Sequence, residues 1–267
     1  MSLDERWLRR FGGIVRLYGQ SVAERLAAAH FVVIGLGGVG SWAAEALART
    51  GVGAITLIDP DEVCLSNVNR QLVGLSSTVG SAKAEVLTAR IHDINPDCRV
   101  DQRLEFLTID NLGELLPPCD GIIDAIDQVG PKTALLNHAK RNKICLIATG
   151  GAGGQRDPRQ IGCADLSQTI NDPLLSKVRN TLRRRYGFPR DGKKFGIEVV
   201  YSTEPLRYPA ADGETCAAKS DAERSSADAP LRLDCASGFG AVTMVTATFG
   251  MMAAARLVER FLARPAA

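Results

Sequence analysis

A glycine-rich segment between residues 35 and 40 has the residue types that bind phosphate. Gly35, Gly37 and Gly40 form the pattern G-x-G-x-x-G directly after the apolar run 31–34. The first glycine allows a tight turn, the second lets the backbone approach a phosphate, and the third permits close packing of a helix whose first N–H groups face the anion. Asp59 follows at the spacing from which a carboxylate reaches a ribose hydroxyl. We therefore predict a nucleotide site, and the pattern alone leaves NAD, FAD and other nucleotides open.

The segments around this loop alternate between strand and helix patterns. Short apolar or β-branched runs predict strands at 31–34, 54–58, 99–104, 121–125 and 144–149. We predict one or two helices within 4–28, and helical patterns predict further helices at 81–94 and 132–141. This alternation predicts the α/β class, with a doubly wound, mainly parallel, Rossmann-like sheet and helices on both faces. Ligands of such sheets lie outside the carboxyl ends of the strands, so we expect one pocket to be surrounded by the glycine loop, Asp59, Asp127 and residues 149–151.

Composition and cysteine spacing favour a reduced, soluble globular protein. A chain of 267 residues with 45% hydrophobic content can bury one large core. Its seven cysteines are scattered without a C-x-x-C pair, which predicts a cytoplasmic location and neither a disulfide framework nor a four-cysteine zinc site. The segment 239–258 approaches the length of a membrane-spanning helix. Its threonines and small residues favour a buried C-terminal helix and no integral membrane insertion, with membrane association as the alternative.

Positive charge is concentrated in residues 177–194, which we call the basic tract. It holds eight lysines and arginines against one acid, whereas the net charge of the whole chain is only +2. Such a concentration favours contacts with the phosphate backbone of a nucleic acid, and a solvated helix face is the alternative. The side chains that we expect to contact RNA are Arg179, Arg183, Arg184, Arg185, Lys193 and Lys194.

Further residues after the glycine loop carry a resemblance to a known family. Besides G-x-G-G-V-G-S and Asp59, the chain has the stretch S-N-x-x-R-Q at 66–71, then Lys83, then Asp127. Together these elements resemble the adenylating domain of ubiquitin-activating-type enzymes, the superfamily that includes the bacterial sulfur-carrier activators. The resemblance implies ATP and Mg²⁺ as cofactors, with Asp127 as the metal ligand. It implies that ATP contacts Gly35, Gly37, Gly38, Gly40, Ser41, Asp59, Asn67, Arg70, Gln71 and Lys83.

The chemistry of adenylation explains why such residue types are needed. A substrate carboxylate attacks the α-phosphate and expels pyrophosphate, so cations such as Arg70 and Lys83 would stabilise the charge that grows on the phosphates. A carboxylate such as Asp127 would place the metal. No general base is required because a carboxylate is already ionised at neutral pH. Taken singly, Arg70 and Lys83 could instead form surface ion pairs, and Asp127 could cap a helix.

A narrower resemblance covers nearly the whole chain. It is carried by the stretches 10–19, 37–59, 149–161, 202–209 and 234–250, which look like those of bacterial tRNA threonylcarbamoyladenosine dehydratases. The resemblance implies that ATP activates the carboxylate of threonylcarbamoyladenosine in tRNA and that the acyl-adenylate then cyclises with loss of AMP. It also implies one domain over 1–267, with an ATP-binding core at 10–155 and a substrate-binding part at 156–267. The alternatives are an activator of a small sulfur carrier with a Gly-Gly tail and a nucleotide-binding module without chemistry.

Two departures from the wider superfamily concern candidate catalytic residues. Gly13 stands where many relatives have an arginine that reaches the ATP of a partner subunit, so Arg10 and Arg16 are candidates to replace it, with Arg10 preferred. Cys235 precedes the C-terminal helix, where a helix N-terminus would lower a thiol pKa, and a buried structural thiol is the alternative. By resemblance we also expect a homodimer, and we leave open cysteine desulfurase or sulfur-acceptor partners and a monovalent cation near residues 234–240. We expect residues 210–229 to form a surface loop.

Overall fold

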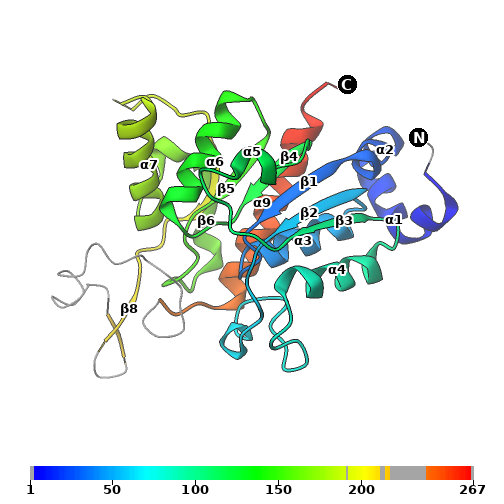
Figure 1. Cartoon of the computed structure of the whole chain (residues 1–267), viewed down its shortest axis with the longest axis horizontal. Coiled ribbons are helices and arrows are strands. Elements are labelled where there is room, and N and C mark those ends of the chain that lie inside the picture. The colour runs from blue at the N-terminus through cyan, green and yellow to red at the C-terminus, as the bar shows by residue number, and fades with distance from the viewer. Residues whose placement is uncertain (1–2, 191, 211–213, 217–238, 266–267) are drawn as a thin grey trace.

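A seven-stranded sheet organises the chain in the computed structural model, which describes residues 3–190, 192–210, 214–216 and 239–265 (Figure 1). The strand order is β3-β2-β1-β4-β5-β7-β6, and only β6 runs antiparallel to its neighbour. The strands are β1 (His30–Ile34), β2 (Ala54–Ile58), β3 (Arg99–Arg103), β4 (Gly121–Asp124), β5 (Leu146–Thr149), β6 (Ile161–Asp165) and β7 (Glu198–Ser202). A small separate hairpin pairs β8 (Tyr208–Pro209) with β9 (Thr215–Cys216). The predicted mainly parallel α/β sheet is confirmed.

Helices cover both faces of the sheet. One face carries α3 (Gly40–Arg49), α4 (Lys83–Ile94) and α9 (Thr243–Leu262). The other carries α5 (Leu112–Leu115), α6 (Val129–Arg141) and α7 (Pro173–Tyr186). Adjacent residues of β1 show why both faces must be covered: Val33 packs in the first core and Val32 in the second, and both are fully buried.

The parallel strands all begin at one edge of the sheet and end at the opposite edge. The glycine loop, Asp59, Ala125 and Gly150 follow the ends of β1, β2, β4 and β5, and we call this side the carboxyl edge. At the opposite, amino edge lie α1 (Glu5–Tyr18) and α2 (Gln20–Ala28), anchored where Trp7 Nε1 donates to the Gly51 carbonyl at 3.2 Å. Candidate nucleotide ligands and the N-terminal helices therefore lie at opposite edges.

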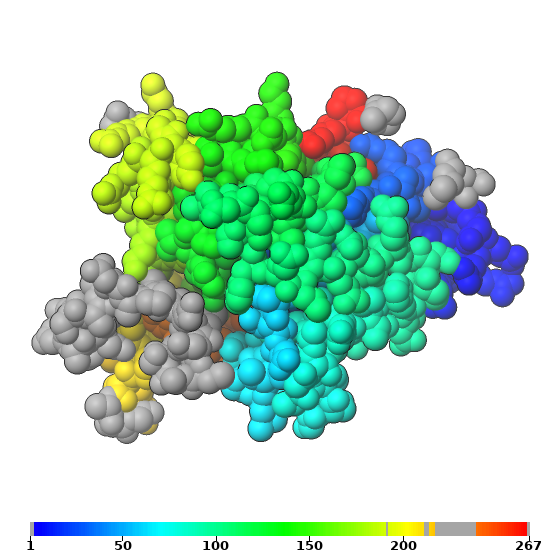
Figure 2. All heavy atoms as spheres, in the orientation of Figure 1, coloured from blue at the N-terminus to red at the C-terminus, as the bar shows by residue number. Residues whose placement is uncertain are grey.

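Helix α7 runs from the carboxyl edge to the amino edge. At its start, the Asp172 carboxylate accepts the N–H of Gly151, which follows β5. Beyond its end, the N–H of Gly196 donates to Asp165, whose register partner begins β7. A helix of 14 residues spans about 21 Å, so the C-terminal end of α7 lies that far from the carboxyl edge. Figure 2 shows the separation on the surface, with the turns of residues 60–80 in cyan at the lower edge and α7 in yellow-green at the upper left.

The C-terminal helix is a core element. The residues that α9 buries recur every four positions, at Val245, Phe249, Ala253 and Leu257, and they pack against the sheet and α3. At Gly250 a Cβ would lie only 2.5 Å from the Val39 carbonyl oxygen, so α9 approaches the start of α3 closely. The predicted buried C-terminal helix is confirmed, and none of the described helices is long and apolar enough to cross a membrane.

Candidate active site

The glycine loop is folded so tightly that side chains are excluded. Gly35 has φ +83° and donates its N–H to the Ile58 carbonyl at 2.9 Å. A Cβ at Gly35 would lie 2.8 Å from the Ala125 carbonyl oxygen, and one at Gly40 would overlap the carbonyl oxygen of Gly35. Helix α3 begins at Gly40 at the carboxyl edge, and in its first turn the N–H groups of Ser41 and Ala43 donate to the carbonyls of Gly37 and Val39 at 3.1 Å each. The predicted strand–turn–helix arrangement of a phosphate site is present.

Two polar side chains support this loop from below. Ser41 is fully buried, and its hydroxyl donates to the Gly37 carbonyl at 2.7 Å and accepts the Leu72 N–H at 3.2 Å. The Ser41 side chain therefore fixes the loop by hydrogen bonds to backbone groups. Gln71 is only 8% exposed and its amide faces Gly37, yet its Oε1 has no hydrogen-bond partner among the described residues. A buried polar atom without a partner beside a phosphate loop fits a ligand group.

Asp59 lies at the end of β2 with its carboxylate turned toward the glycine loop. One oxygen accepts the Leu36 N–H at 2.6 Å and the other accepts the Asp61 N–H at 2.8 Å. Each oxygen keeps a second lone pair that a ribose hydroxyl could use. Burial raises the pKa of Asp59, and the nearby charge of Lys83 opposes that effect.

Lys83 holds a buried positive charge at the same edge. Its side chain is 7% exposed, and Nζ lies 2.8 Å from Oδ2 of Asp61, whose own side chain is 53% exposed. Because an ammonium group has three donors, Lys83 can keep this pair and still donate to a phosphate. Lys83 begins α4, and the backbone N–H of Lys83 donates to the Asp61 carbonyl, which fixes both residues relative to β2.

The turn after β2 presents Arg70. Asn67 closes the 3-10 helix η1 (Leu65–Asn67) by accepting the Cys64 N–H at 3.0 Å. The Arg70 carbonyl accepts from Trp42 Nε1 at 3.2 Å and from the Thr246 hydroxyl at 3.1 Å, so α3 and α9 both fix its backbone. The guanidinium donates to the Ser66 carbonyl and to the Asn69 side chain. No carboxylate of the described chain neutralises it, and this leaves a positive charge at the rim of the site.

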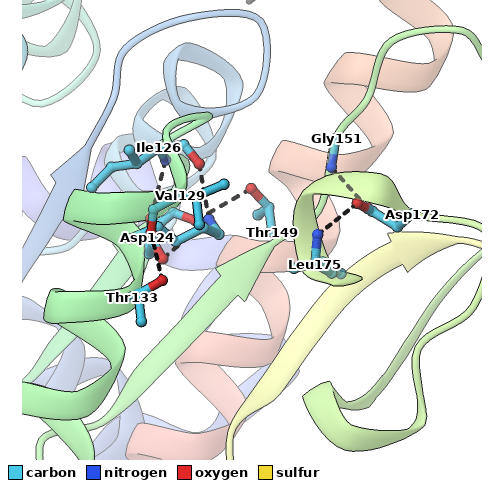
Figure 3. A network of polar contacts seen from close by, with 9 residues as sticks. Asp124, Ile126, Val129, Thr133, Thr149, Gly151, Asp172 and Leu175 are labelled. Carbon is cyan, nitrogen blue, oxygen red and sulfur yellow. Dashed lines mark hydrogen bonds and ion pairs between the residues drawn. The ribbon is translucent and has the colours of Figure 1, made fainter. Parts of the chain in front are cut away.

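Asp127 follows β4 on a loop that a buried ion pair holds in place. Nζ of Lys132 lies 3.1 Å from Oδ2 of Asp124, and both side chains are completely buried. Asp124 also accepts the Ile126 N–H at 3.1 Å, while Lys132 donates to the Ile126 carbonyl at 3.0 Å. Figure 3 shows Asp124 below Ile126, with Thr149 beside them and Gly151 near Asp172. Asp127 itself is exposed, and nowhere in the described ranges does its carboxylate form a hydrogen bond or ion pair.

The sequence analysis did not single out Asp124 or Lys132. The available signal was a lysine on the apolar face of a helix, since Lys132 shares that face with the buried Leu135, Leu136 and Ala139. A charge at such a position must be paired, and the stretch 124–132 contains the acid that pairs with it.

Comparisons with known proteins show the family. The ThiF family model matches residues 13–265. The chain is 52% identical to the tRNA threonylcarbamoyladenosine dehydratase of Escherichia coli K12, over 99% of this chain and 97% of that protein. It is 47% identical to the Haemophilus influenzae protein of the same name, over 98% of this chain and 97% of that protein. This chain belongs to the ThiF family, among its tRNA threonylcarbamoyladenosine dehydratases.

A solved structure of this family gives the same picture in three dimensions. The Escherichia coli tRNA N6-threonylcarbamoyladenosine dehydratase in complex with ATP superposes with a TM-score of 0.86 at 46% identity, and 98% of each chain is covered. Both the resemblance to these dehydratases and the fold class inferred from the sequence are confirmed.

Two candidate catalytic residues are not brought to this site of the ThiF chain. Arg10 is exposed on α1 and donates weakly to the Ile94 carbonyl at 3.4 Å, at the amino edge. The glycine loop lies at the other edge, so within one chain Arg10 does not contribute to the site. Only a second copy could bring it there. Cys235 lies outside the described residues, as do 211–213 and 217–229 of the segment expected to form a surface loop.

The structure divides the basic tract of this ThiF protein into two groups. Arg179 is tied to the chain itself, since its guanidinium donates to the Thr169 hydroxyl and, at 2.9 Å, to the Thr169 carbonyl. Arg183 stacks on the Phe195 ring at 5.3 Å. The other four residues expected to contact RNA are exposed and meet no acidic side chain of the described ranges: Arg184, Arg185, Lys193 and Lys194. This free charge lies at the amino edge, far from the glycine loop.

Proposed function

We propose that this chain uses ATP to activate the carboxylate of threonylcarbamoyladenosine in tRNA and thereby dehydrates that nucleoside to a cyclic product. The observation that carries the proposal is that Asp59, Lys83, Arg70 and Asp127 gather around the glycine loop of a chain similar over nearly its full length to dehydratases of this name. Two structures of the Escherichia coli relative were solved with ATP and with AMP, the substrate and product expected of adenylation followed by cyclisation.

The polar groups of the carboxyl edge suit the parts of ATP. In the proposed arrangement Asp59 accepts from the ribose hydroxyls, and the glycine loop with the positive end of the α3 dipole faces the α-phosphate. Asn67, Arg70 and Lys83 lie nearest to the outer phosphates. The positive charges at Arg70 and Lys83 then oppose the negative charge that develops as pyrophosphate leaves.

Asp127 fits a magnesium ligand. It is an exposed carboxylate at the carboxyl edge, and its oxygens are free of partners in the part of the chain that the structure describes. Mg²⁺ in nucleotide sites is commonly held by one or two carboxylates together with substrate phosphates, so a single aspartate suffices. When bound, the ion neutralises charge on the leaving phosphates. The Asp124–Lys132 pair keeps the Asp127 loop in place for this role.

The reaction has two steps, and the first needs no general base because the attacking carboxylate is already ionised. A carboxylate oxygen of the substrate forms a bond to the α-phosphorus, and the bond to the pyrophosphate oxygen breaks. The carbamoyl group of the same side chain then attacks the activated carbonyl carbon and loses an N–H proton to solvent, and AMP leaves with the former carboxylate oxygen. Because the second step is intramolecular, holding the side chain in place supplies most of the rate enhancement of that step.

Three of the described cysteines are poorly suited to act as nucleophiles of a thioester or persulfide route. Burial raises the pKa of Cys98 to about 12 and that of Cys119 to about 11, and it also raises the pKa of Cys145. Such thiols are inert at neutral pH.

The direct test is to incubate the purified protein with ATP, Mg²⁺ and tRNA carrying threonylcarbamoyladenosine. The nucleosides are then analysed by mass spectrometry. We expect loss of one water from the modified nucleoside and release of an equal amount of AMP. An unchanged nucleoside, with exchange of pyrophosphate into ATP only when a small carrier protein is added, would instead support a sulfur-carrier activator.

A further inference from the structure

A hollow lined by three arginines lies at the same edge of the sheet as the glycine loop. It has a volume of about 670 Å³, and its described lining comes from the segments 156–160 and 204–207, which follow β5 and β7. The hollow therefore opens at the carboxyl edge. Its walls include three arginines, two carboxylates and the apolar side chains of Pro205 and Leu206.

Both carboxylates in the wall are already engaged. Glu204 is 8% exposed, and its Oε2 accepts the backbone N–H groups of Arg156 and Asp157 at 2.9 Å each. This contact joins the two segments that form the hollow. Asp157 binds the guanidinium of Arg159 with two hydrogen bonds, at 2.8 and 3.1 Å. Among the described residues, neither acid forms an ion pair with Arg156 or Arg207.

Two guanidinium groups consequently remain available. The Arg156 side chain is exposed and has no acidic partner within the described ranges. Arg207 makes one long side-chain contact, to the Thr215 hydroxyl at 3.4 Å, while its backbone N–H donates to the Gly154 carbonyl at 2.9 Å. Unpaired arginines next to apolar side chains suit RNA, because guanidinium groups bind phosphates and stack on bases.

The hollow is tied to the turn that carries Arg70. The N–H of Gly154 donates to the Gly240 carbonyl at 2.7 Å, and the Asn69 amide donates to the carbonyl of the next residue, Ala241, at 2.8 Å. Two consecutive residues thus bridge the hollow and the turn. The free charges of the basic tract, in contrast, lie at the amino edge, about 21 Å away along α7.

The chemistry of the substrate requires an unpaired strand at this place. The threonylcarbamoyl group is attached to N6 of adenine, an atom on the edge that pairs with other bases. Its carboxylate can reach the α-phosphate only if the nucleotide is unpaired or turned out of its stack. The neighbouring nucleotides then also lie at the carboxyl edge, where their phosphates need cations.

We propose that this hollow binds the single-stranded RNA that flanks the modified adenosine. Arg156 and Arg207 contact backbone phosphates, and Leu206 packs against a base. The inference rests on the proposed function, and it gives the substrate-binding part at 156–267 a specific RNA contact. It also assigns different tasks to two surfaces: the hollow holds the reacting segment, and the basic tract holds a distant part of the tRNA.

The test compares binding of a short single-stranded RNA that contains threonylcarbamoyladenosine, measured by fluorescence anisotropy. For the double variant Arg156→Ala/Arg207→Ala we expect an affinity at least about tenfold lower, since two charge-assisted contacts to phosphate are lost. Affinity for a fluorescent ATP analogue is expected to stay unchanged. The control Arg9→Ala/Arg141→Ala removes the same charge at exposed sites elsewhere and is expected to leave both affinities as they are.

Other results would overturn either the assignment of the hollow or the proposed function. Unchanged affinity of the double variant for the short RNA, or an equal loss in the control, overturns the assignment of the hollow. If ATP binding by the double variant falls as well, we measure Arg156→Lys, which keeps the positive charge. If Arg156→Lys binds ATP normally but binds the RNA as weakly as Arg156→Ala does, the assignment of the hollow is also overturned. If the unaltered protein fails to dehydrate the nucleoside, the proposed function fails. If it turns over while the variants bind RNA normally, only the hollow is wrong.

Discussion

Lys132 and Asp124 form an ion pair in which Nζ lies 3.1 Å from Oδ2 and neither side chain is exposed to solvent. Lys132 also donates to the Ile126 carbonyl, and the pair thereby fixes the loop that carries Asp127. Burial raises the pKa of Asp124, and the charge of Lys132 opposes that rise. The pair thus links the stability of the core to the position of the proposed metal ligand.

Replacing Lys132 by methionine leaves the buried Asp124 without its partner. We expect Lys132→Met to lower the free energy of unfolding by about 3 to 5 kcal/mol, measured by denaturant titration. The double variant Asp124→Asn/Lys132→Met removes both charges and is expected to be less destabilised than Lys132→Met alone. Equal stability of the double and single variants would show that the two charges are not coupled.

Asp127→Asn separates turnover from folding. Because the side chain is exposed, the melting temperature is expected to stay unchanged. AMP release with the modified tRNA is expected to fall by about a hundredfold to a thousandfold, the range for losing one group that stabilises transition-state charge. Asp110→Asn, at another exposed aspartate, serves as the control. Full activity of Asp127→Asn would remove Asp127 from the proposed metal site.

Within the basic tract, free and tied arginines have different expected effects. Arg184→Ala/Arg185→Ala is expected to weaken binding of full-length tRNA and to reduce the slope of log affinity against log salt by about one unit per arginine. Arg179→Ala removes hydrogen bonds to Thr169 and is expected to cost about 1 to 3 kcal/mol of stability instead. Salt titrations and denaturant titrations of both variants give the comparison. An unchanged salt slope for the first variant would favour a merely solvated helix face.

The buried thiols predict a pH-dependent pattern of alkylation. At pH 8 we expect iodoacetamide to modify the exposed Cys64, while Cys98 and Cys119, whose pKa values are about 12 and about 11, stay unmodified. In the unfolded chain these thiols ionise at lower pH, so their contribution to stability is full below the ordinary thiol pKa and is lost as pH rises toward 12. Peptide mapping by mass spectrometry reads out each thiol. Modification of Cys98 at pH 8 in the folded protein would contradict its burial.

Most of the fold could be predicted because local patterns and the overall topology agree. The apolar run 31–34, the glycine loop and the helix after it are consecutive in the sequence, and their structure follows from local sterics at Gly35 and Gly40. The predicted helix at 132–141 begins earlier, at Val129, because Pro131 is accommodated in a first turn, where its missing N–H costs nothing.

The parts of the site that were missed depend on tertiary structure. The pairing of Lys132 with Asp124 requires α6 to lie against the end of β4, and the sequence carries no direct signal of that distance. Likewise, the charge count of the basic tract did not indicate that Arg179 would donate its hydrogen bonds to Thr169. Nor did it indicate that the C-terminal end of α7 would place other charges at the amino edge of the sheet. No local sequence pattern predicts the hollow, because Arg156 and Arg207 are far apart in sequence.

The central claim is that a carboxylate of the modified nucleoside attacks the α-phosphate of ATP. It is tested most directly with tRNA whose threonylcarbamoyl carboxylate carries ¹⁸O, by mass spectrometry of the nucleotides released during turnover. The account predicts AMP that contains one labelled oxygen, in an amount equal to the dehydrated nucleoside. Labelled inorganic phosphate together with ADP would place the attack on the terminal phosphate and contradict the account.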